Sequence, residues 1–252
     1  MLETILYALV FIYGIIVGSF LNVCIYRIPL KESVVTTRSH CMRCGYKLKW
    51  YDLVPVFSYV FLRGRCRKCG DRISPQYPVI ELLNGILWVL TFIYTGINIT
   101  SLIYSLVISA LIVLSVIDFR TFEIPVSINV YIGIMALVNI ATDYEHILTY
   151  IIGMIIVSGV LYLMYFLSNG RAIGGGDVKL MAACGLLLGW KLIIVAFIFG
   201  CLYASVIHIL RMVISKKDHM LAMGPYLSAG VITAMWFGSH IVNWYVTCLF
   251  PG

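Results

Sequence analysis

The chain has 252 residues, of which 62% are apolar and 12% are charged, and its mean hydropathy is +0.99. These values lie outside the range of soluble globular domains, so the composition indicates an integral membrane protein. The apolar runs do not alternate with polar residues, which excludes a membrane β-barrel. The net charge of +7 is typical of many nucleic-acid-binding proteins, but the basic residues fall between the apolar runs, where they report membrane topology.

The first apolar run, residues 4–25, is expected to remain in the protein as a membrane anchor. It follows Glu3 where a signal peptide carries positive charge, and it lacks the small residues of a cleavage site. The basic residues after it, Arg27 and Lys31, predict that the amino terminus lies outside the cell and that the next segment is cytoplasmic.

Further apolar runs, each able to cross about 30 Å of hydrocarbon as a helix, predict an all-α polytopic membrane protein with about eight transmembrane helices. The expected spans are residues 4–26, 79–96, 101–118, 124–142, 147–168, 178–189, 191–213 and 225–249. The sixth is too short to cross alone, but Trp190 and Lys191 mark an interface, so it is expected to form a tight hairpin with the seventh. This topology places every lysine and arginine except Lys191 on the cytoplasmic side.

The predicted domain organisation has three parts. Residues 1–27 form the first transmembrane helix, residues 28–78 form a small cytoplasmic tetracysteine domain, and residues 79–252 form the membrane-embedded core. The middle part is too short to bury a large hydrophobic core, and domains of this size commonly need a metal ion or disulfides.

Two C-x-x-C motifs, each followed by a glycine, indicate how that small domain is stabilised. Four thiolates that converge on one ion favour a structural, tetrahedral Zn²⁺ site in a zinc-ribbon-like fold. The predicted ligands are Cys41, Cys44, Cys66 and Cys69. The alternatives are free thiols or redox-active pairs; disulfides are not expected in a reducing cytoplasm.

Basic residues surround the second motif, and they predict contact with anionic lipid headgroups. These residues are Arg63, Arg65, Arg67, Lys68 and Arg72. A basic ribbon is also typical of RNA-binding modules, but its position between two spans favours lipid or polypeptide contact, so no nucleic-acid partner is predicted.

Two acids at the edges of apolar runs are the candidate catalytic residues. Asp118 follows the apolar residues 101–117, and Asp177 follows three glycines at the start of another apolar segment. An aspartate near hydrocarbon costs roughly 2.5 to 3.5 kcal/mol on insertion scales, so it usually serves a function. Two close carboxylates share one proton, and such a pair activates water for attack on a peptide carbonyl.

Gly174, Gly175 and Gly176 are expected to form a substrate loop or hinge, because glycine lets a backbone approach an extended substrate. A G-x-G-D pattern alone is a weak signal. The structural alternative is that Asp177 caps a helix and that Asp118 pairs with Arg120 or Lys179.

Taken together, these motifs resemble the type IV prepilin peptidases, which are bacterial aspartic membrane proteases. The resemblance extends over most of the chain. Its pieces, in order, are Gly18-Ser19-Phe20-Leu21-Asn22-Val23, Tyr26-Arg27-Ile28-Pro29, Arg38-Ser39, Trp50-Tyr51-Asp52-Leu53-Val54-Pro55, Leu62-Arg63-Gly64-Arg65-Cys66, Ile73-Ser74, Tyr77-Pro78, Glu81, Asp118, Ile124-Pro125, Gly174-Gly175-Gly176-Asp177-Val178-Lys179 and Gly224-Pro225.

The resemblance implies that Asp118 and Asp177 are the catalytic pair of an endopeptidase in the bacterial cytoplasmic membrane. Such an enzyme removes the leader from type IV prepilins or pseudopilins, on the cytoplasmic side and after a glycine. Many members then methylate the new amino terminus with S-adenosyl-L-methionine, and the complete tetracysteine segment favours this bifunctional form. No residue is indicated for the methyl donor.

Two other classes of protein are alternatives to a peptidase. A transporter would use the two acids as proton or cation sites, but such sites lie near the bilayer midplane between repeated halves, whereas these acids lie at one edge. A membrane scaffold with a zinc ribbon leaves both acids unexplained.

Overall fold

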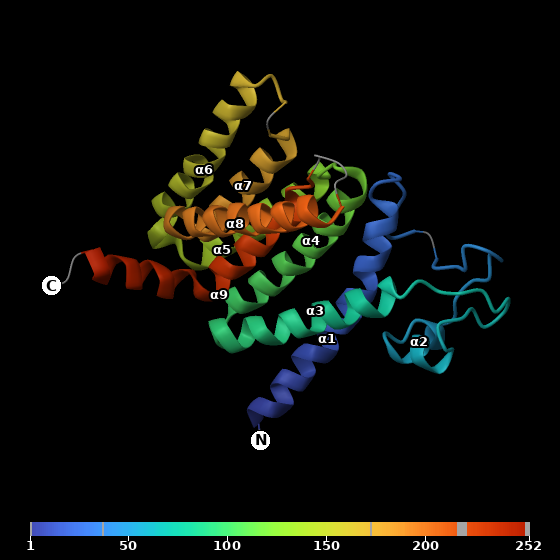
Figure 1. The fold of residues 1–252 in the computed structure, drawn as a ribbon. Helices are drawn as coiled ribbons and strands as arrows, with labels where there is room; N and C mark the ends of the chain where they lie inside the picture. The colour runs from blue at the N-terminus through green and yellow to red at the C-terminus, as the bar shows by residue number, and fades with distance from the viewer. Residues whose placement is uncertain (1, 37, 172, 216–220, 250–252) are drawn as a thin grey trace. The chain divides into compact units, whose positions relative to one another are not determined.

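The computed structural model describes residues 2–36, 38–171, 173–215 and 221–249, and nearly all of them outside residues 28–75 are helical (Figure 1). Each of the eight predicted spans overlaps one helix of 14 to 26 residues. These helices are α1 (Leu2–Arg27), α3 (Gln76–Thr95), α4 (Ile99–Thr121), α5 (Val126–Thr142), α6 (Ile147–Leu167), α7 (Gly175–Leu188), α8 (Trp190–Ser215) and α9 (Gly224–Leu249). A short helix, α2 (Phe57–Phe61), lies between α1 and α3. Strand-like pairing among the described residues is limited to two isolated bridges, so the all-α prediction is confirmed.

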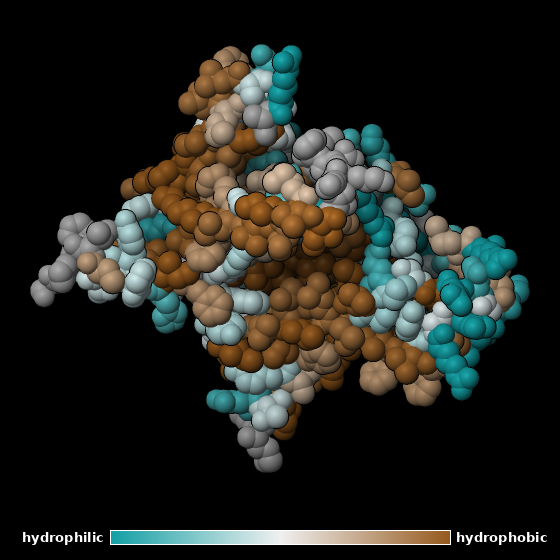
Figure 2. Space-filling model, viewed as in Figure 1, coloured by the Kyte–Doolittle hydropathy of each residue, from teal (hydrophilic) through white to brown (hydrophobic). Residues whose placement is uncertain are grey.

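Five of the described helices, α1, α3, α4, α6 and α8, are long and apolar enough to cross a membrane. Helix α5 is apolar but has only 17 residues. Figure 2 shows apolar side chains over the outer surfaces of the helices and hydrophilic side chains over much of the segment that joins α1 to α3. An integral membrane protein is therefore confirmed, whereas the count of eight spans remains a prediction.

The chain forms two compact units, residues 1–97 and 98–252. In the first unit, α1 and α3 lie side by side (Figure 1). Glycines bring their backbones close together: a Cβ on Gly14 would lie 2.8 Å from the Cα of Gly85, and a Cβ on Gly18 would lie 2.7 Å from the Cα of Glu81. Small residues at such contacts are typical of packed membrane helices.

In the second unit, α4 is the most deeply buried helix and packs against α5 and α9. Its core positions Ile108, Leu111 and Leu114 are fully buried. Helix α7 packs against α5 and α6, and α8 packs against α9. This arrangement brings the carboxyl end of α4 and the amino ends of α7 and α9 to one region of the unit.

The contact between α6 and α7 depends on two glycines. A Cβ on Gly185 would lie 2.7 Å from the carbonyl carbon of Gly153, so no side chain fits there. We expect Gly185→Ala to destabilise the protein by about 1 to 3 kcal/mol, because overpacking forces backbone shifts. Thermal unfolding in detergent measures this, with Gly133→Ala in α5 as the control, since a Cβ there has no neighbour within 4 Å. Equal unfolding midpoints for the two variants contradict the prediction.

Candidate active site and metal centre

Asp118 and Asp177 line one pocket of about 290 Å³ in the second unit. Asp118 lies in the last turn of α4, and Asp177 lies in the first turn of α7. The other lining residues are Phe122, Glu123, Ile124, Gly174, Gly175 and Gly176. The structure thus brings the two acids and all three glycines of the predicted site to a single cavity.

Asp118 is held at the amino end of α9. Its side chain is almost fully buried, with 4% of the residue exposed, and its Oδ2 accepts a hydrogen bond of 2.8 Å from the backbone N–H of Gly224. Gly224 is the first residue of α9, where unpaired N–H groups carry partial positive charge. The ionised form of Asp118 is therefore stabilised by the helix that begins beside it.

The glycine segment allows a close contact between α7 and the chain before α5. A Cβ on Gly176 would lie 2.8 Å from the Cβ of Ile124, and a Cβ on Gly174 would lie 3.1 Å from Oδ2 of Asp177. Neither glycine has a positive φ angle, so close approach, not an unusual backbone conformation, explains why glycine is needed. The hinge role of the segment remains a prediction.

The structural alternative for the acids is only partly compatible with this geometry. The alternative assigns Asp118 to Arg120 or Lys179, whereas its Oδ2 accepts a hydrogen bond from the backbone N–H of Gly224. Asp177 does lie in the first turn of α7, where a carboxylate is favourable. That position stabilises the helix, but it does not account for Asp118, a buried acid on the same pocket.

The four cysteines of the two motifs converge in the first unit. The ligand atoms of Cys41, Cys44, Cys66 and Cys69 all lie within 4.8 Å of one another, and Sγ of Cys41 lies 3.9 Å from Sγ of Cys69. None of these cysteines forms a disulfide. Zn–S bonds of about 2.3 Å in a tetrahedron place sulfurs about 3.8 Å apart, so the donor set fits a zinc ion.

The two motifs have the same backbone geometry. In each, the N–H of the following glycine donates to the carbonyl oxygen of the first cysteine at 2.9 Å, from Gly45 to Cys41 and from Gly70 to Cys66. Gly45 and Gly70 have φ angles of 66° and 71°, a region that favours glycine. Hydrogen bonds from the backbone of Cys44 and Arg43 lower the pKa of the Cys41 thiol to about 6, whereas the pKa of the Cys69 thiol is raised to about 12, in part by hydrogen bonds with the other three thiols. Cys41 is therefore the thiol of the cluster that loses its proton most readily.

Two ion pairs brace the cysteine cluster. Arg43 of the first motif donates to Asp71 beside the second motif at 2.7 Å. Arg67 of the second motif donates through Nε to Asp52 at 2.7 Å and lies over the ring of Tyr51. Arg67, which was predicted to contact lipid headgroups, therefore has an internal partner.

The chain is similar to bacterial leader peptidases along most of its length. A profile of the Bacterial Peptidase A24 N-terminal domain matches residues 12–95, and a profile of the Type IV leader peptidase family matches residues 105–209. The prepilin leader peptidase/N-methyltransferase of Bacillus subtilis (strain 168) is 31% identical over 244 residues, which are 95% of this chain and 97% of that protein. The chain belongs to the type IV leader peptidase family.

Two further relatives have the same name. The protein of Myxococcus xanthus (strain DK1622) is 33% identical over 82% of this chain and 63% of that protein. The protein of Aeromonas salmonicida (strain A449) is 28% identical over 96% of this chain and 94% of that protein. No solved structure matches the chain. The family resemblance and the assignment as a membrane peptidase are confirmed, and the names of the relatives support an accompanying N-methyltransferase activity.

The part that Gly224 plays in this family member could not be read from the sequence. The motif Gly224-Pro225 is visible in the sequence. The sequence does not indicate, however, that the backbone N–H of Gly224 donates to Asp118, which lies in a different helix. The same holds for Glu81, which lies in the first unit and accepts a hydrogen bond of 2.7 Å from the backbone N–H of Val56. Both hydrogen bonds could have been predicted only with knowledge of which helices and loops pack together.

Gly224→Ala is expected to lower leader-peptide cleavage by about 10²-fold, because displacing a catalytic group by about 1 Å has effects of that size. A Cβ on Gly224 would lie 2.6 Å from Oδ2 of Asp118, so the carboxylate has to move. Comparing kcat/KM with that of Gly159→Ala tests this, since a Cβ on Gly159 meets only Ile155 at 3.8 Å. If both variants cleave equally well, the Gly224 contact does not position Asp118.

Proposed function

We propose that this chain is an aspartic endopeptidase that removes the leader of type IV prepilins or pseudopilins by cutting after a glycine at the cytoplasmic face of the membrane. A second activity, methylation of the new amino terminus with S-adenosyl-L-methionine, completes the proposal. The observation that supports the peptidase activity is that Asp118 and Asp177 line the same pocket, where one carboxylate oxygen of Asp118 is held by the backbone N–H of Gly224.

The geometry suggests separate roles for the two acids. Two carboxylates on one small pocket repel each other when both are ionised, so one of them keeps a proton. The hydrogen bond from Gly224 favours the ionised form of Asp118, which makes Asp118 the base and leaves the proton on Asp177.

In the proposed reaction, a water molecule attacks the carbonyl carbon of the scissile peptide bond. Asp118 accepts a proton from this water, and Asp177 donates its proton to the carbonyl oxygen. The resulting tetrahedral intermediate collapses as the C–N bond breaks, and the proton held by Asp118 passes to the leaving amine. Asp177 recovers its proton from the hydroxyl that becomes the new carboxyl group.

The pocket also fits the proposed specificity. Its volume of about 290 Å³ is small, at the low end of ligand pockets, and Gly174, Gly175 and Gly176 form part of its wall without side chains. An extended backbone with a small residue at the cut can therefore approach Asp177. A bulky side chain before the scissile bond is expected to be excluded.

We infer that the tetracysteine cluster holds a structural zinc ion, because its four sulfurs fit a closed tetrahedral site with no position for substrate. The zinc would stabilise residues 28–78, and it supplies no step of the cleavage. The methyl donor would supply an electrophilic methyl group to the new terminal amine. The names of the relatives support this second activity, and no residue of this chain is assigned to it.

The charge distribution supports a pocket that faces the cytoplasm. Arg120 follows Asp118 in α4, and Arg171 and Lys179 flank Asp177, and all three side chains are exposed. Asp143 lies at the opposite end of α5. By the positive-inside rule, the end of the helices with Arg120 and Lys179 is cytoplasmic, residues 28–78 are cytoplasmic and the amino terminus is outside.

The decisive experiment uses the purified full-length protein in detergent with a peptide that has a basic leader, a glycine and an apolar segment. Mass spectrometry is expected to show one cut, after the glycine, and the gain of one methyl group on the product when S-adenosyl-L-methionine is present. A peptide with leucine in place of the glycine is the control and is expected to stay intact. Absence of cleavage, or a cut that ignores the glycine, contradicts the proposal.

A further inference from the structure

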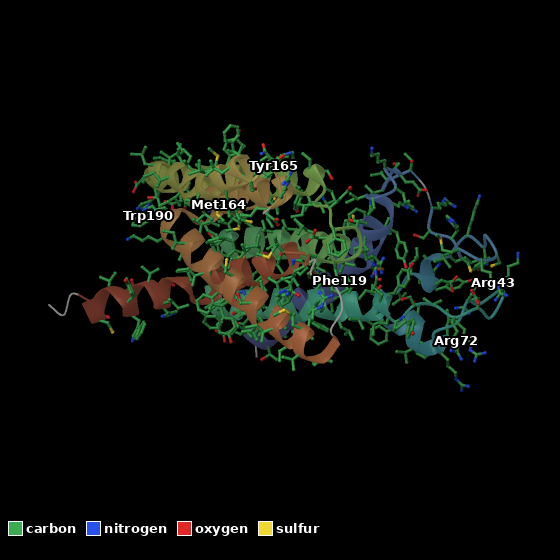
Figure 3. All side chains as sticks on the ribbon, turned by 45° about the horizontal axis from the view of Figure 1, so that its top comes forward. Arg43, Arg72, Phe119, Met164, Tyr165 and Trp190 are labelled. Atoms are coloured by element: carbon green, nitrogen blue, oxygen red, sulfur yellow. The ribbon has the colours of Figure 1, made fainter. Side chains whose placement is uncertain are left out.

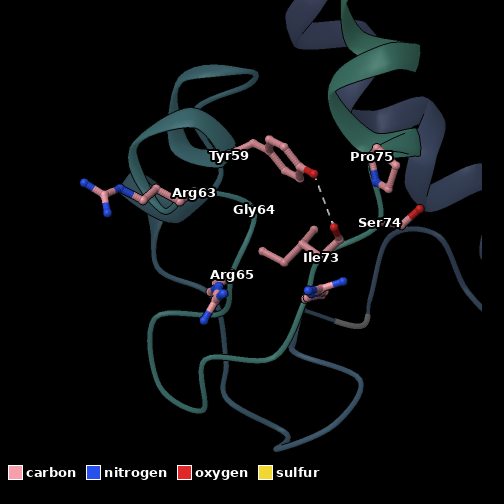
Figure 4. Close-up of a pocket in the computed structure, with 8 residues that line it drawn as sticks. Tyr59, Arg63, Gly64, Arg65, Ile73, Ser74 and Pro75 are labelled. Atoms are coloured by element: carbon pink, nitrogen blue, oxygen red, sulfur yellow. Dashed lines mark hydrogen bonds between the residues drawn. The ribbon is translucent and has the colours of Figure 1, made fainter.

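A second pocket lies in the first unit, just before α3 (Figure 4). Its volume is about 550 Å³, and it is lined by Tyr59, Arg63, Gly64, Arg65, Arg72, Ile73, Ser74 and Pro75. Three of these residues are arginines and none is acidic. We name it the arginine pocket.

The backbone brings two of the arginines together. Arg65 and Arg72 are partners in an isolated antiparallel bridge, so their side chains leave the same face of the pair. Like charges directly opposite each other in such a pair are destabilising. An anion bound between the two guanidinium groups would remove this repulsion.

Acids inside the protein do not neutralise the arginine pocket. The nearby arginines Arg43 and Arg67 are paired with Asp71 and Asp52. In the described part of the chain, by contrast, Arg63, Arg65 and Arg72 form no ion pair, and all three are exposed. Arg72, like Arg43, extends outward from the segment that joins α1 to α3 (Figure 3).

The wall of the pocket is held by specific contacts. Ile73 N–H donates to the Gly64 carbonyl at 2.8 Å, and the Tyr59 hydroxyl donates to the Ile73 carbonyl at 3.4 Å (Figure 4). Gly64 has a φ of 66°, and a Cβ on it would lie 2.9 Å from the Tyr59 hydroxyl oxygen. Arg65 also precedes Cys66 of the metal centre, so the pocket has a fixed frame.

The position of the pocket indicates where its ligand comes from. Ser74 and Pro75 directly precede α3, one of the five helices that are long and apolar enough to cross a membrane. The pocket therefore lies at the depth of lipid headgroups, where juxtamembrane arginines bind anionic lipids. The first turn of α3 has no acidic residue, so its partial positive charge adds to that of the arginines.

Helix α2, which leads into the pocket, presents large apolar side chains to its surroundings. Phe61 is 83% exposed, Val60 is 65% exposed and Phe57 is 59% exposed. A cluster of this kind beside basic residues is typical of segments that lie in a membrane interface. A site for a free anion in the cytosol does not need these apolar side chains.

We propose that the arginine pocket binds the phosphate group of an anionic phospholipid, with Arg63, Arg65 and Arg72 around the phosphate and the apolar side chains of α2 against the acyl region. The site rests on the proposed cytoplasmic placement of residues 28–78, and it does not depend on the catalytic roles of the two acids. It fixes the tetracysteine domain to the membrane surface.

The test is native mass spectrometry of the full-length protein in detergent, titrated with phosphatidylglycerol or phosphatidylcholine. The wild type is expected to bind phosphatidylglycerol at least about tenfold more tightly, and the variant R63Q/R65Q/R72Q is expected to lose this preference. The control K31Q/R38Q/K47Q removes the same charge from exposed positions outside the pocket and is expected to keep the preference. If both triple variants behave alike, the preference reflects net charge and the proposal is wrong.

Two further arms separate the source of the anion and the state of the variant. Inorganic phosphate at millimolar concentration is expected not to displace phosphatidylglycerol; displacement would reassign the pocket to a free anion. Zinc content and cleavage in neutral detergent report whether R63Q/R65Q/R72Q is folded. If it is not folded, the single variant R72Q is tested instead, and its preference for phosphatidylglycerol is expected to fall by at least about threefold. Because cleavage is measured separately, failure of the lipid site and failure of the peptidase assignment give different results.

Discussion

Replacement of Asp118 or Asp177 by asparagine is expected to lower kcat for leader cleavage by about 10²- to 10⁴-fold, the usual contribution of a general acid or base. An amide at position 118 cannot take the proton of the attacking water, and an amide at position 177 cannot supply the proton to the carbonyl oxygen. In the Asp118→Asn variant, the Gly224 N–H still finds an amide oxygen as its acceptor. The fold at the start of α9 is therefore expected to survive.

The matched control for these variants is Glu123→Gln. Glu123 lines the same pocket but is exposed and lies in the link between α4 and α5, so its loss is expected to change kcat by less than about tenfold. All three variants are measured on the same peptide, with thermal unfolding and zinc content as measures of folding. If Asp118→Asn and Asp177→Asn both cut at the wild-type rate, the catalytic assignment fails; if only Glu123→Gln is inactive, the base must be reassigned to Glu123.

The positions of the helices could be predicted from the sequence because polar residues, glycine or proline mark the ends of each apolar run. Helix α7, the least certain of the predicted spans, begins after Gly174 and ends at Gly189, which has a φ of 78° and is followed by Trp190. The cysteine cluster was also readable, since a local turn brings together the two thiols of each C-x-x-C motif, and a closed zinc site takes four such ligands. Patterns that are local in the chain were therefore sufficient for the elements and for the cysteine cluster.

Contacts between distant elements were not readable in this way. The glycines at positions 176 and 224 look alike in the sequence, but one makes room for Ile124 and the other makes room for Asp118. Arg67 and Arg72 likewise look equivalent, yet only Arg67 has Asp52 as its partner. Such assignments depend on which helices and turns pack together, and one sequence does not contain that information.

Removal of the metal is expected to unfold residues 39–73, because this segment has little buried apolar surface to hold it in place. Binding of structural zinc to short peptides contributes about 10 to 16 kcal/mol, and this binding free energy is also folding free energy. Cys66 is the most buried ligand of the four, and Cys66→Ser is expected to reduce zinc from one ion per chain to almost none. Limited proteolysis is then expected to cut between α1 and α3.

The control for this change is Cys248→Ser, which removes an exposed thiol of α9 outside the cluster and is expected to keep the zinc and the proteolysis pattern. Since Arg65 of the arginine pocket directly precedes Cys66, loss of the metal is also expected to abolish the preference for anionic lipid. Cleavage is expected to fall only as a secondary effect, because Asp118 and Asp177 belong to the other compact unit. The prediction is wrong if the wild type purifies without zinc and Cys66→Ser resists protease as well as the wild type does. In that case the four cysteines are free or redox-active thiols. The hydrogen bonds and ion pairs around them are then sufficient to fold residues 39–73.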